Sequence, residues 1–531
     1  MKKRSLIALG IASALVLSAC GANDSADEAT GNGNGEGEVV GGELNIAYNA
    51  QPPTLDVVNT TAHAARIMAR LVFEPLLDLD ANGHVQPVLA EDYEVSDDGL
   101  TLTFTLRDDV TFHDGSPMEA ADAVASVQRW LDVSIIGGTY FGEAEVDSPE
   151  EGIVELTLPQ PMYLAPELFA DPGQMPYIMP AEVIDAAEAD GVQEYVGTGP
   201  YVFGTWETDQ YLRFDRYEDY ASAAGEPSAM AGEKTPYYDE MYIHFVSDDT
   251  TRLSGLQTGE YDVASPIDSD NLAALEADPN VELVPGEAGL AFALFNKNEG
   301  DSPMADINMR RAVVAAMDTE AMLIAAFTSD EYFSNNSAFM PEGTPWHVEV
   351  DPEFEDFYQN QDLDLAAQYL DEAGYDGETI TLVASPDYGD HFAQATILQQ
   401  QLEDAGMNTE LVTPDFPTVL EIMSEGTDFE IAFSHLSNWP LVPITSYFFA
   451  PDTQGATDDQ AIFDATDALV NAADEEEATA AMEELEAAYQ DYLPVIKIGD
   501  RRTATGTSAD LTGFDHPTSI GEIFHHIRPV A

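Results

Sequence analysis

Residues 96–117 read SDDGLTLTFTLRDDVTFHDGSP and hold the clearest structural pattern in the chain. Between positions 100 and 106, leucine and phenylalanine alternate with threonine, which is the period of a strand with one buried face. Aspartate–glycine pairs at 98–99 and 114–115 predict tight turns on both sides of this strand. Residues 116–119 carry serine, proline and glutamate at the spacing of a capping box, which predicts a helix to about residue 131.

Strands and helices alternate further along the chain as well. Residues 43–48 predict an opening strand, and the segment that follows residue 199 is rich in strands. After residue 286 the elements alternate as in an α/β layered domain. Helices are expected there at 308–316, 319–327, 364–373 and 394–405, and strands at 291–295, 380–384 and 409–413. A chain of 531 residues is too long for one core, so two or three units are expected.

The first twenty residues have the features of an export signal. Basic residues at 2–4 precede an apolar run at 6–17 that is too short to span a bilayer. The Leu-Ser-Ala-Cys sequence that ends at Cys20 resembles a bacterial or archaeal lipobox, which implies cleavage before Cys20 and lipidation of its thiol. The alternative is an ordinary cleaved signal with an incidental cysteine. We expect a lipoprotein signal peptide at 1–20.

The segment that follows, residues 21–42, is almost wholly small, polar or acidic. This composition cannot bury a core, so it predicts a flexible tether. Cys20 is the only cysteine in the sequence, which excludes an internal disulfide. No later stretch is apolar for long enough to span a membrane. The predicted location is the cell envelope, at the outer face of the cytoplasmic membrane, in a periplasmic or extracellular setting.

The charge of the chain is extreme. There are 99 Asp and Glu residues against 18 Lys and Arg, for a formal net charge of −81. Such a surface repels itself in dilute buffer, whereas at molar salt the Debye length falls to about 3 Å. We therefore expect a halophilic type of surface that is stable in high external salt. The same charge excludes nucleic acid as a partner and argues against a polybasic membrane patch.

The sequence contains no catalytic signature that we recognise: no nucleophile elbow, zinc-protease helix, P-loop or dinucleotide fingerprint. His113 is expected to be a turn residue that is hydrogen-bonded locally. His525 and His526 are adjacent, so their side chains should point apart and not share a metal. We expect no enzymatic activity, no cofactor and no metal. A secreted lipoprotein hydrolase is kept as the alternative from another functional class.

Short blocks spread over the chain carry a family resemblance. They are FEPLL at 73–77, PVLAE at 87–91, SDDGLT at 96–101, FHDGSP at 112–117, VGTGPY at 196–201, LQTGEYD at 256–262 and EAGY at 372–375. In this order and spacing they resemble the ABC-importer solute-binding proteins of extracellular solute-binding protein family 5, the peptide/nickel class. The Gly- and Pro-containing blocks fit turns, so they indicate the fold and not the ligand.

The resemblance implies an α/β fold of the type II periplasmic-binding-protein kind, with two lobes joined by a hinge. Carried onto this chain, lobe I is 43–285 plus 497–531, with an extra subdomain at about 78–195, and lobe II is 286–496. The two crossing segments are expected near 285–291 and 493–499.

The implied function is that of a solute-binding receptor for an ABC importer, which captures a small solute by hinge closure and delivers it to a permease and its ATPase. The receptor is expected to be a monomer. A di- or oligopeptide is the preferred solute; nickel chelates, oligosaccharides and opine-like compounds are alternatives in the same family. Peptide-binding members carry an aspartate in the loop that matches 435–445, and this chain has none there. Asp415 and Asp428 are the acids considered as substitutes. A signalling or chaperone-like lipoprotein of the same fold is a third possibility.

The ligand should lie between the lobes, where strands end. The predicted contacts are Tyr48, Asn49, Tyr140 and Phe141 on lobe I, and Asn296, His435, Asn438 and Trp439 on lobe II. Trp439 follows a predicted strand at 430–434 and would supply a flat apolar wall with one hydrogen-bond donor.

Overall fold

The computed structural model describes residues 41–188, 191–267, 271–298, 302–436, 441–450, 455 and 457–530. All of them belong to one compact unit, Val39–Ala531. Within these residues no helix combines the length and the apolar character needed to cross a membrane. The predicted signal peptide, Cys20 and nearly all of the predicted tether lie outside the described residues.

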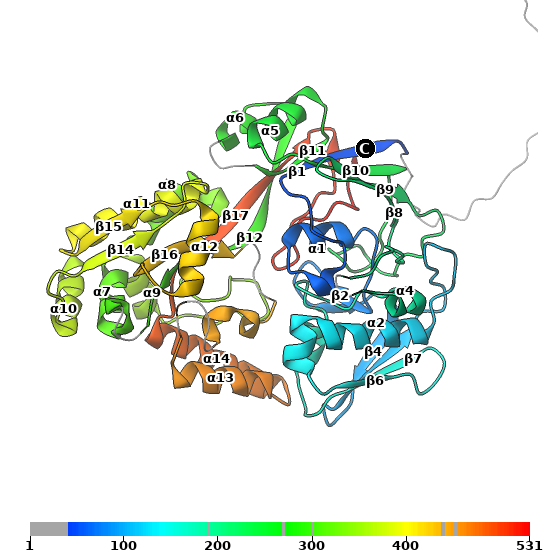
Figure 1. Ribbon diagram of the computed structural model, residues 1–531, viewed down its shortest axis with the longest axis horizontal. Coiled ribbons are helices and arrows are strands. Elements are labelled where there is room, and N and C mark those ends of the chain that lie inside the picture. The colour runs from blue at the N-terminus through cyan, green and yellow to red at the C-terminus, as the bar shows by residue number, and fades with distance from the viewer. Residues whose placement is uncertain are drawn as a thin grey trace, which may run out of the picture. The chain divides into compact units, whose positions relative to one another are not determined.

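One long mixed sheet runs through the unit (Figure 1). Its order is β15 (Asn408–Val412), β14 (Thr379–Val383), β16 (Ile431–Leu436), β12 (Val281–Phe295), β17 (Val495–Ser508), β11 (Val263–Ile267), β1 (Glu43–Tyr48), β10 (Glu240–Phe245), β9 (Tyr211–Arg216) and β8 (Tyr201–Glu207), with β13 (Phe333–Ser334) also paired to β17. Strands from distant parts of the chain are neighbours in this sheet, so it links the beginning, middle and end of the sequence.

The strands β12 and β17 join the two halves of the sheet. On one side β12 pairs with β16 from Leu290 onward, and on the other β17 pairs with β11 from Ala504 onward. Between these points β12 and β17 pair only with each other and with β13. We call residues 41–285 with 504–530 the first half, and residues 290–499 the second half. The second crossing therefore lies at about 500–503, a few residues later than the segment 493–499 expected from the sequence.

The first half contains a separate four-stranded sheet in addition to its share of the long sheet. Its order is β4 (Ala90–Val95), β5 (Thr101–Leu106), β7 (Ile153–Thr157) and β6 (Glu145–Asp147). The remaining elements of this half are α1 (His63–Ala69), α2 (Ala120–Val133), α3 (Ala165–Phe169), α4 (Ala181–Asp185), α5 (Asp249–Thr258), α6 (Leu272–Glu276), β2 (Leu77–Leu79), β3 (Val85–Pro87), β18 (Leu511–Thr512) and β19 (Arg528–Pro529). The small sheet lies inside the range predicted for the extra subdomain.

The quoted stretch forms the predicted strand, but its helix begins later than predicted. In β5 every second side chain is buried, as the alternation requires. Glu119 is the N-cap of α2, and Asp122 completes the capping box. Ser116 instead bonds to Asp114, and the peptide groups of 116 and 118 pair back to the strand before the turn. These backbone bonds extend the turn by three residues before the helix begins.

In the second half, helices cover a parallel core of β14, β15 and β16. The helices are α7 (Ile307–Ala316), α8 (Thr319–Phe327), α9 (Pro352–Gln359), α10 (Leu363–Ala373), α11 (Gly389–Asp404), α12 (Phe416–Glu425), α13 (Gln460–Val470) and α14 (Glu475–Tyr492). The predicted bounds of α7 and α8 are confirmed to within one residue, whereas α10 is capped by Asp362 and not by Asp364 as predicted. Helix α11 starts five residues earlier than predicted. Its first turn therefore includes the side chains of Asp390 and His391.

The two halves also touch away from the crossing strands. The Tyr140 hydroxyl donates to the Ile444 carbonyl at 2.9 Å, and the Tyr163 N–H donates to the Ala472 carbonyl at 2.8 Å. Phe339, Phe448 and Tyr489 belong to the same hydrophobic cluster as the core of the small sheet. The body is therefore joined at the crossing strands and again where α13 and α14 approach the extra sheet (Figure 1).

Candidate ligand-binding groove

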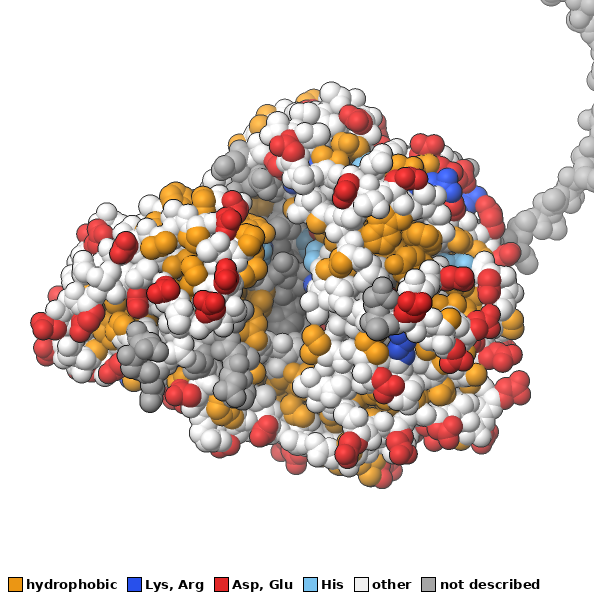
Figure 2. Space-filling model, in the orientation of Figure 1, with side chains coloured by type: hydrophobic (Ala, Val, Ile, Leu, Met, Phe, Trp, Pro, Cys, Tyr) orange, Lys and Arg blue, Asp and Glu red, His pale blue; other side chains and the backbone are white. Residues whose placement is uncertain are grey.

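A groove separates the two halves between these two points of contact. Figure 2 shows it with hydrophobic side chains along both walls and histidine at its surface. Figure 1 places α1 and β2 of the first half on one side, and β16 and α12 of the second half on the other. The ends of β1 and β16 lead toward this space, which agrees with the rule that ligands of open α/β sheets sit at strand ends.

Tyr48 ends β1 on the first wall. Its ring is buried, whereas the next residue, Asn49, is exposed. The Nε2 atom of His63 lies 2.8 Å from a carboxylate oxygen of the buried Glu522. Burial opposes the charged form of Glu522, but His63 and His516 hold the pKa of its carboxyl well below the ordinary value. Burial and the Glu522 carboxylate raise the pKa of Tyr48, so its phenol stays protonated.

Arg66 of α1 and Asp171, which follows α3, are charged residues of the first half that influence each other electrostatically. Asp171 Oδ1 accepts a hydrogen bond from the Gly173 N–H at 2.7 Å, while its buried Oδ2 has no hydrogen-bond partner among the described residues. Burial raises the pKa of Asp171 to about 6, although Gly173 and Arg66 act in the opposite direction. Burial lowers the pKa of Arg66, and its Nε likewise has no partner in the described part of the chain. The fold therefore leaves an acceptor and a donor of opposite charge unused.

The second wall carries a histidine pair. His435 lies near the end of β16, and its Nδ1 is 2.7 Å from Nε2 of His391 in the first turn of α11. Asp390 precedes His391, and its Oδ2 is 3.9 Å from an Arg501 nitrogen. Tyr388 packs its ring against both imidazoles, with centroids 4.9 and 5.2 Å away. Burial lowers the pKa of both histidines, for His435 together with Arg501 and His391, so the pair is neutral and one N–H donates to the other ring.

Comparison with protein families identifies this architecture. The model for "Bacterial extracellular solute-binding proteins, family 5 Middle" matches residues 84–458, which is more than half of the chain. The chain belongs to extracellular solute-binding protein family 5. This membership confirms the sequence-based family assignment.

Relatives of this family 5 protein include two proteins with functional names. The probable peptide ABC transporter periplasmic-binding protein y4tO of Sinorhizobium fredii is 30% identical over 367 residues, which cover 68% of each chain. The glutathione-binding protein GsiB of Escherichia coli is 27% identical over 417 residues, covering 78% of this chain and 74% of that protein.

A solved structure gives the fold. The ABC transporter substrate binding protein CtaP of Listeria monocytogenes superposes with a TM-score of 0.81 at 22% identity, covering 92% of this chain and 99% of that one. This confirms the predicted type II periplasmic-binding-protein fold.

Two predicted contacts of this family 5 chain are core residues, and those predictions are corrected. Phe141 is fully buried, with its ring centroid 4.9 Å from that of Trp130. Asn296 is also buried, and its amide donates to the carbonyls of Gly426 and Phe429 at 3.1 and 2.9 Å. Both side chains are fully engaged in packing or in holding backbone, so neither is available to a ligand.

The remaining predicted contacts have different outcomes. Tyr140 reaches the second half through its bond to Ile444, so it is a contact between the halves as well as a groove candidate. Asn438 and Trp439 lie outside the described residues, as does Cys20. Tyr48, Asn49 and His435 lie at strand ends as expected, and their contact with a ligand stays a prediction.

The acids and histidines that the sequence analysis considered also have assigned positions. Asp415 accepts a hydrogen bond from Thr418 N–H as the N-cap of α12, and Asp428 is an exposed turn residue with φ of 62°. His113 is a turn residue as predicted, but its ring is not bonded locally: Nε2 lies 2.9 Å from the carbonyl oxygen of Gly199, 86 positions along the chain.

Sequence reasoning missed Arg66, Asp171 and His391. A single carboxylate carries no information in a chain with 99 of them, and only the burial of Asp171 distinguishes it. His391 lies 44 positions before His435, so nothing in the spacing joins them. The sequence does place His391 shortly after a predicted strand at 380–384. The predicted helix at 394–405 begins after His391, so it gives this histidine no position on the helix.

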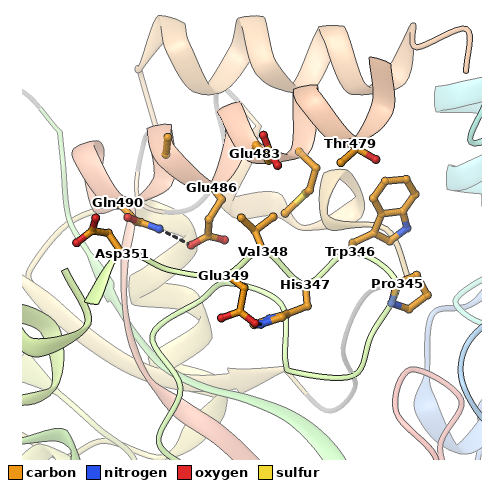
Figure 3. A pocket seen from close by; sticks show the side chains of 12 residues that line it. Pro345, Trp346, His347, Val348, Glu349, Asp351, Thr479, Glu483, Glu486 and Gln490 are labelled. Atoms are coloured by element: carbon orange, nitrogen blue, oxygen red, sulfur yellow. Dashed lines mark hydrogen bonds and ion pairs between the residues drawn. The ribbon is translucent and has the colours of Figure 1, made fainter. Parts of the chain in front are cut away.

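Outside the groove, the described residues also line two other cavities. One of about 530 Å³ lies between residues 345–351 and α14 (Figure 3). There the buried Glu486 accepts hydrogen bonds from Gln490 and from the Phe339 N–H, both at 3.1 Å, and burial raises the pKa of its carboxyl. The other, of about 550 Å³, is on the first half beside residues 193–196. Because the fold already uses Glu486, the groove remains the better candidate for a ligand site.

Proposed function

We propose that this protein is the lipid-anchored receptor of an ABC importer, and that it binds a di- or oligopeptide without altering it. The observation that carries the proposal is the groove between two halves that the described chain connects through the crossing strands β12 and β17. A ligand that touches both walls binds the closed arrangement better and shifts the population toward it. The closed form is then recognised by a membrane permease.

A lipid on Cys20 would keep this receptor close to its permease. The segment 21–42 has the composition of a flexible linker, and a linker of this kind raises the effective concentration of the tethered partner. The family description as extracellular agrees with this location.

The charges of the first half support a peptide as the solute. A peptide presents an ammonium group at one end and a carboxylate at the other. The unused Asp171 Oδ2 suits the ammonium group, and the unused Arg66 Nε suits the carboxylate. This assignment also gives the chain an acid in place of the one that the 435–445 loop lacks. The names of the relatives, a peptide transporter component and a glutathione-binding protein, support the same class of solute.

Native mass spectrometry tests the proposal. Full-length protein purified in molar salt, with its co-purified solute and with added dipeptides, is expected to carry one peptide per chain and to release it with unchanged mass. A nickel chelate, an oligosaccharide or an opine-like compound in its place would exclude the peptide and keep the receptor. Recovery of cleaved peptide would support the hydrolase instead.

The variant Asp171→Asn sharpens this test. Loss of the buried carboxylate is expected to weaken peptide binding at least tenfold. It should also stabilise the free protein at pH 7 by about 3 kcal/mol, because a pKa raised by burial from 3.8 to about 6 costs about 1.4 kcal/mol per unit. Asp185→Asn, on the exposed surface of α4, is the control and should change neither quantity. Unchanged peptide affinity in Asp171→Asn would remove Asp171 from the site.

A further inference from the structure

Asp390, His391 and His435 offer three ligand atoms that all lie within 4.8 Å of one another. Asp390 and His391 come from the first turn of α11, and His435 comes from the end of β16. His435 pairs with Ala291 of β12. Ala291 lies two residues after Gly289, which pairs with Arg501 of β17 in the crossing segment. The cluster therefore lies where the second half joins the crossing strands, at the strand ends that border the groove.

The fold leaves part of the hydrogen-bonding capacity of these three residues unused, and the two facing imidazole nitrogens bond only to each other. His391 is fully buried, yet its Nδ1 has no hydrogen-bond partner among the described residues. Asp390 Oδ2 is buried and accepts no hydrogen bond there; its nearest cation is Arg501, at 3.9 Å. The bond between the two imidazoles needs one shared proton. Buried polar atoms without partners are costly and uncommon, so such a cluster calls for an explanation beyond stability.

We propose that Asp390, His391 and His435 bind a divalent transition-metal ion, with coordination positions left open toward the groove. Two imidazole nitrogens and one carboxylate oxygen suit zinc, nickel or cobalt, whereas magnesium and calcium prefer oxygen ligands alone. The ion replaces the proton shared between the rings. With metal–nitrogen bonds of about 2.0–2.1 Å, the two nitrogens separate from 2.7 Å to about 3.0–3.4 Å, a shift that small ring rotations supply.

One charged neighbour affects how well the ion binds. Arg501 opposes the ion, because its positive charge lies beside Asp390. If the peptide-receptor function holds, the open positions accept a carbonyl oxygen of the bound peptide; this second role rests on the proposed function, and the metal site itself does not.

Calorimetric titration of the metal-stripped, full-length protein tests the site. Zinc, nickel and cobalt chlorides are added in molar sodium chloride with excess magnesium, which saturates non-specific carboxylate sites. One equivalent is expected to bind, and cobalt should develop visible absorption bands typical of nitrogen ligation. Absence of binding above the magnesium background overturns the proposal.

Variants link the binding to the three residues. His435→Gln and Asp390→Asn are each expected to weaken metal binding at least tenfold, and Arg501→Gln should strengthen it. The control is His84→Gln, which alters an exposed histidine 3.6 Å from Asp80 and should have no effect. Unaltered far-ultraviolet circular dichroism shows that each variant is folded. Stoichiometric binding that survives His435→Gln overturns the assignment.

The two proposals fail separately. Metal titration without peptide reports only the cluster, and peptide binding measured in a chelator reports only the groove. Peptide affinity that is the same with and without zinc excludes the shared coordination but leaves both the metal site and the receptor in place.

Discussion

In the first half, His113 uses both ring nitrogens on the backbone: Nε2 lies 2.9 Å from the Gly199 oxygen, and Nδ1 accepts from the Gly197 N–H at 3.3 Å. In the second half, His391 and His435 are also held neutral by burial, but they bond to each other, and His391 Nδ1 has no partner in the described residues. The ring nitrogens of His113 bond to the backbone and so stabilise the fold. The ring nitrogens of His391 and His435 make no bond to the backbone among the described residues, so they could bind a ligand. Burial and a lowered pKa are common to both, so neither feature alone identifies a site.

The same contrast applies to the charges of the first half. Glu74 is buried and fully engaged: it accepts from Lys234 and from Tyr220, both at 2.8 Å, and from Thr198 at 3.1 Å. Asp171, in the same half, has one oxygen without a partner among the described residues. Substituting the engaged groups should reduce stability, whereas substituting the available ones should change binding.

The largest effect is expected for Glu74→Ala. Its removal leaves the Lys234 ammonium buried without its anion, so the free energy of unfolding should fall by about 3–5 kcal/mol. Urea denaturation in molar salt measures this loss, with the exposed Glu91→Ala as the control. A loss below 1 kcal/mol would show that paired charges of this half contribute no more than exposed ones, and the comparison would fail.

The pH dependence of His113→Gln gives the next largest effect. Burial lowers the pKa of folded His113, so below about pH 6.5 the unfolded chain binds a proton that the folded chain does not. Stability is therefore lost as the pH falls through 6.5, with a slope of up to about 1.4 kcal/mol per pH unit for each such group. Denaturation between pH 7.5 and 5.5 should show a shallower slope for this variant.

The exposed His84→Gln serves as the reference for that experiment. Its slope should equal that of the unaltered protein, because the side chain is exposed at the surface. An equal slope for His113→Gln would mean that the bonds to Gly197 and Gly199 do not keep the ring neutral.

The smallest effect is expected for Tyr140→Phe. The change removes the hydroxyl that donates to the Ile444 carbonyl across the two halves, which should cost about 1 kcal/mol. Small-angle scattering should show a larger average radius of gyration, because one contact that holds the halves together is lost. Tyr369→Phe, within the second half, is the control and should leave the radius unchanged. An unchanged radius of gyration in Tyr140→Phe would show that the bond to Ile444 does not help to hold the two halves together.

Much of the fold could be predicted because local patterns determine it. The alternation at 100–106 became β5, and the bounds of α8 were predicted to the residue, since Asp318 caps it as its position suggests. The predicted start of α2 was wrong because backbone bonds of residues 116 and 118 to residues 112 and 110 extend the preceding turn. The site was harder to predict, since it depends on burial. Phe141 and Asn296 have the residue types of a ligand contact but lie in the core, while Asp171 gained significance only from its surroundings.

The crossing strands have a mechanical consequence for the whole body. β12 and β17 stay hydrogen-bonded to each other through the crossing, where Gly286 lies opposite Thr503. A Cβ atom on Gly286 would lie 2.2 Å from Nδ1 of His516, so this point tolerates no side chain. Rotation of one half against the other is thereby reduced to bending and torsion of a two-stranded ribbon.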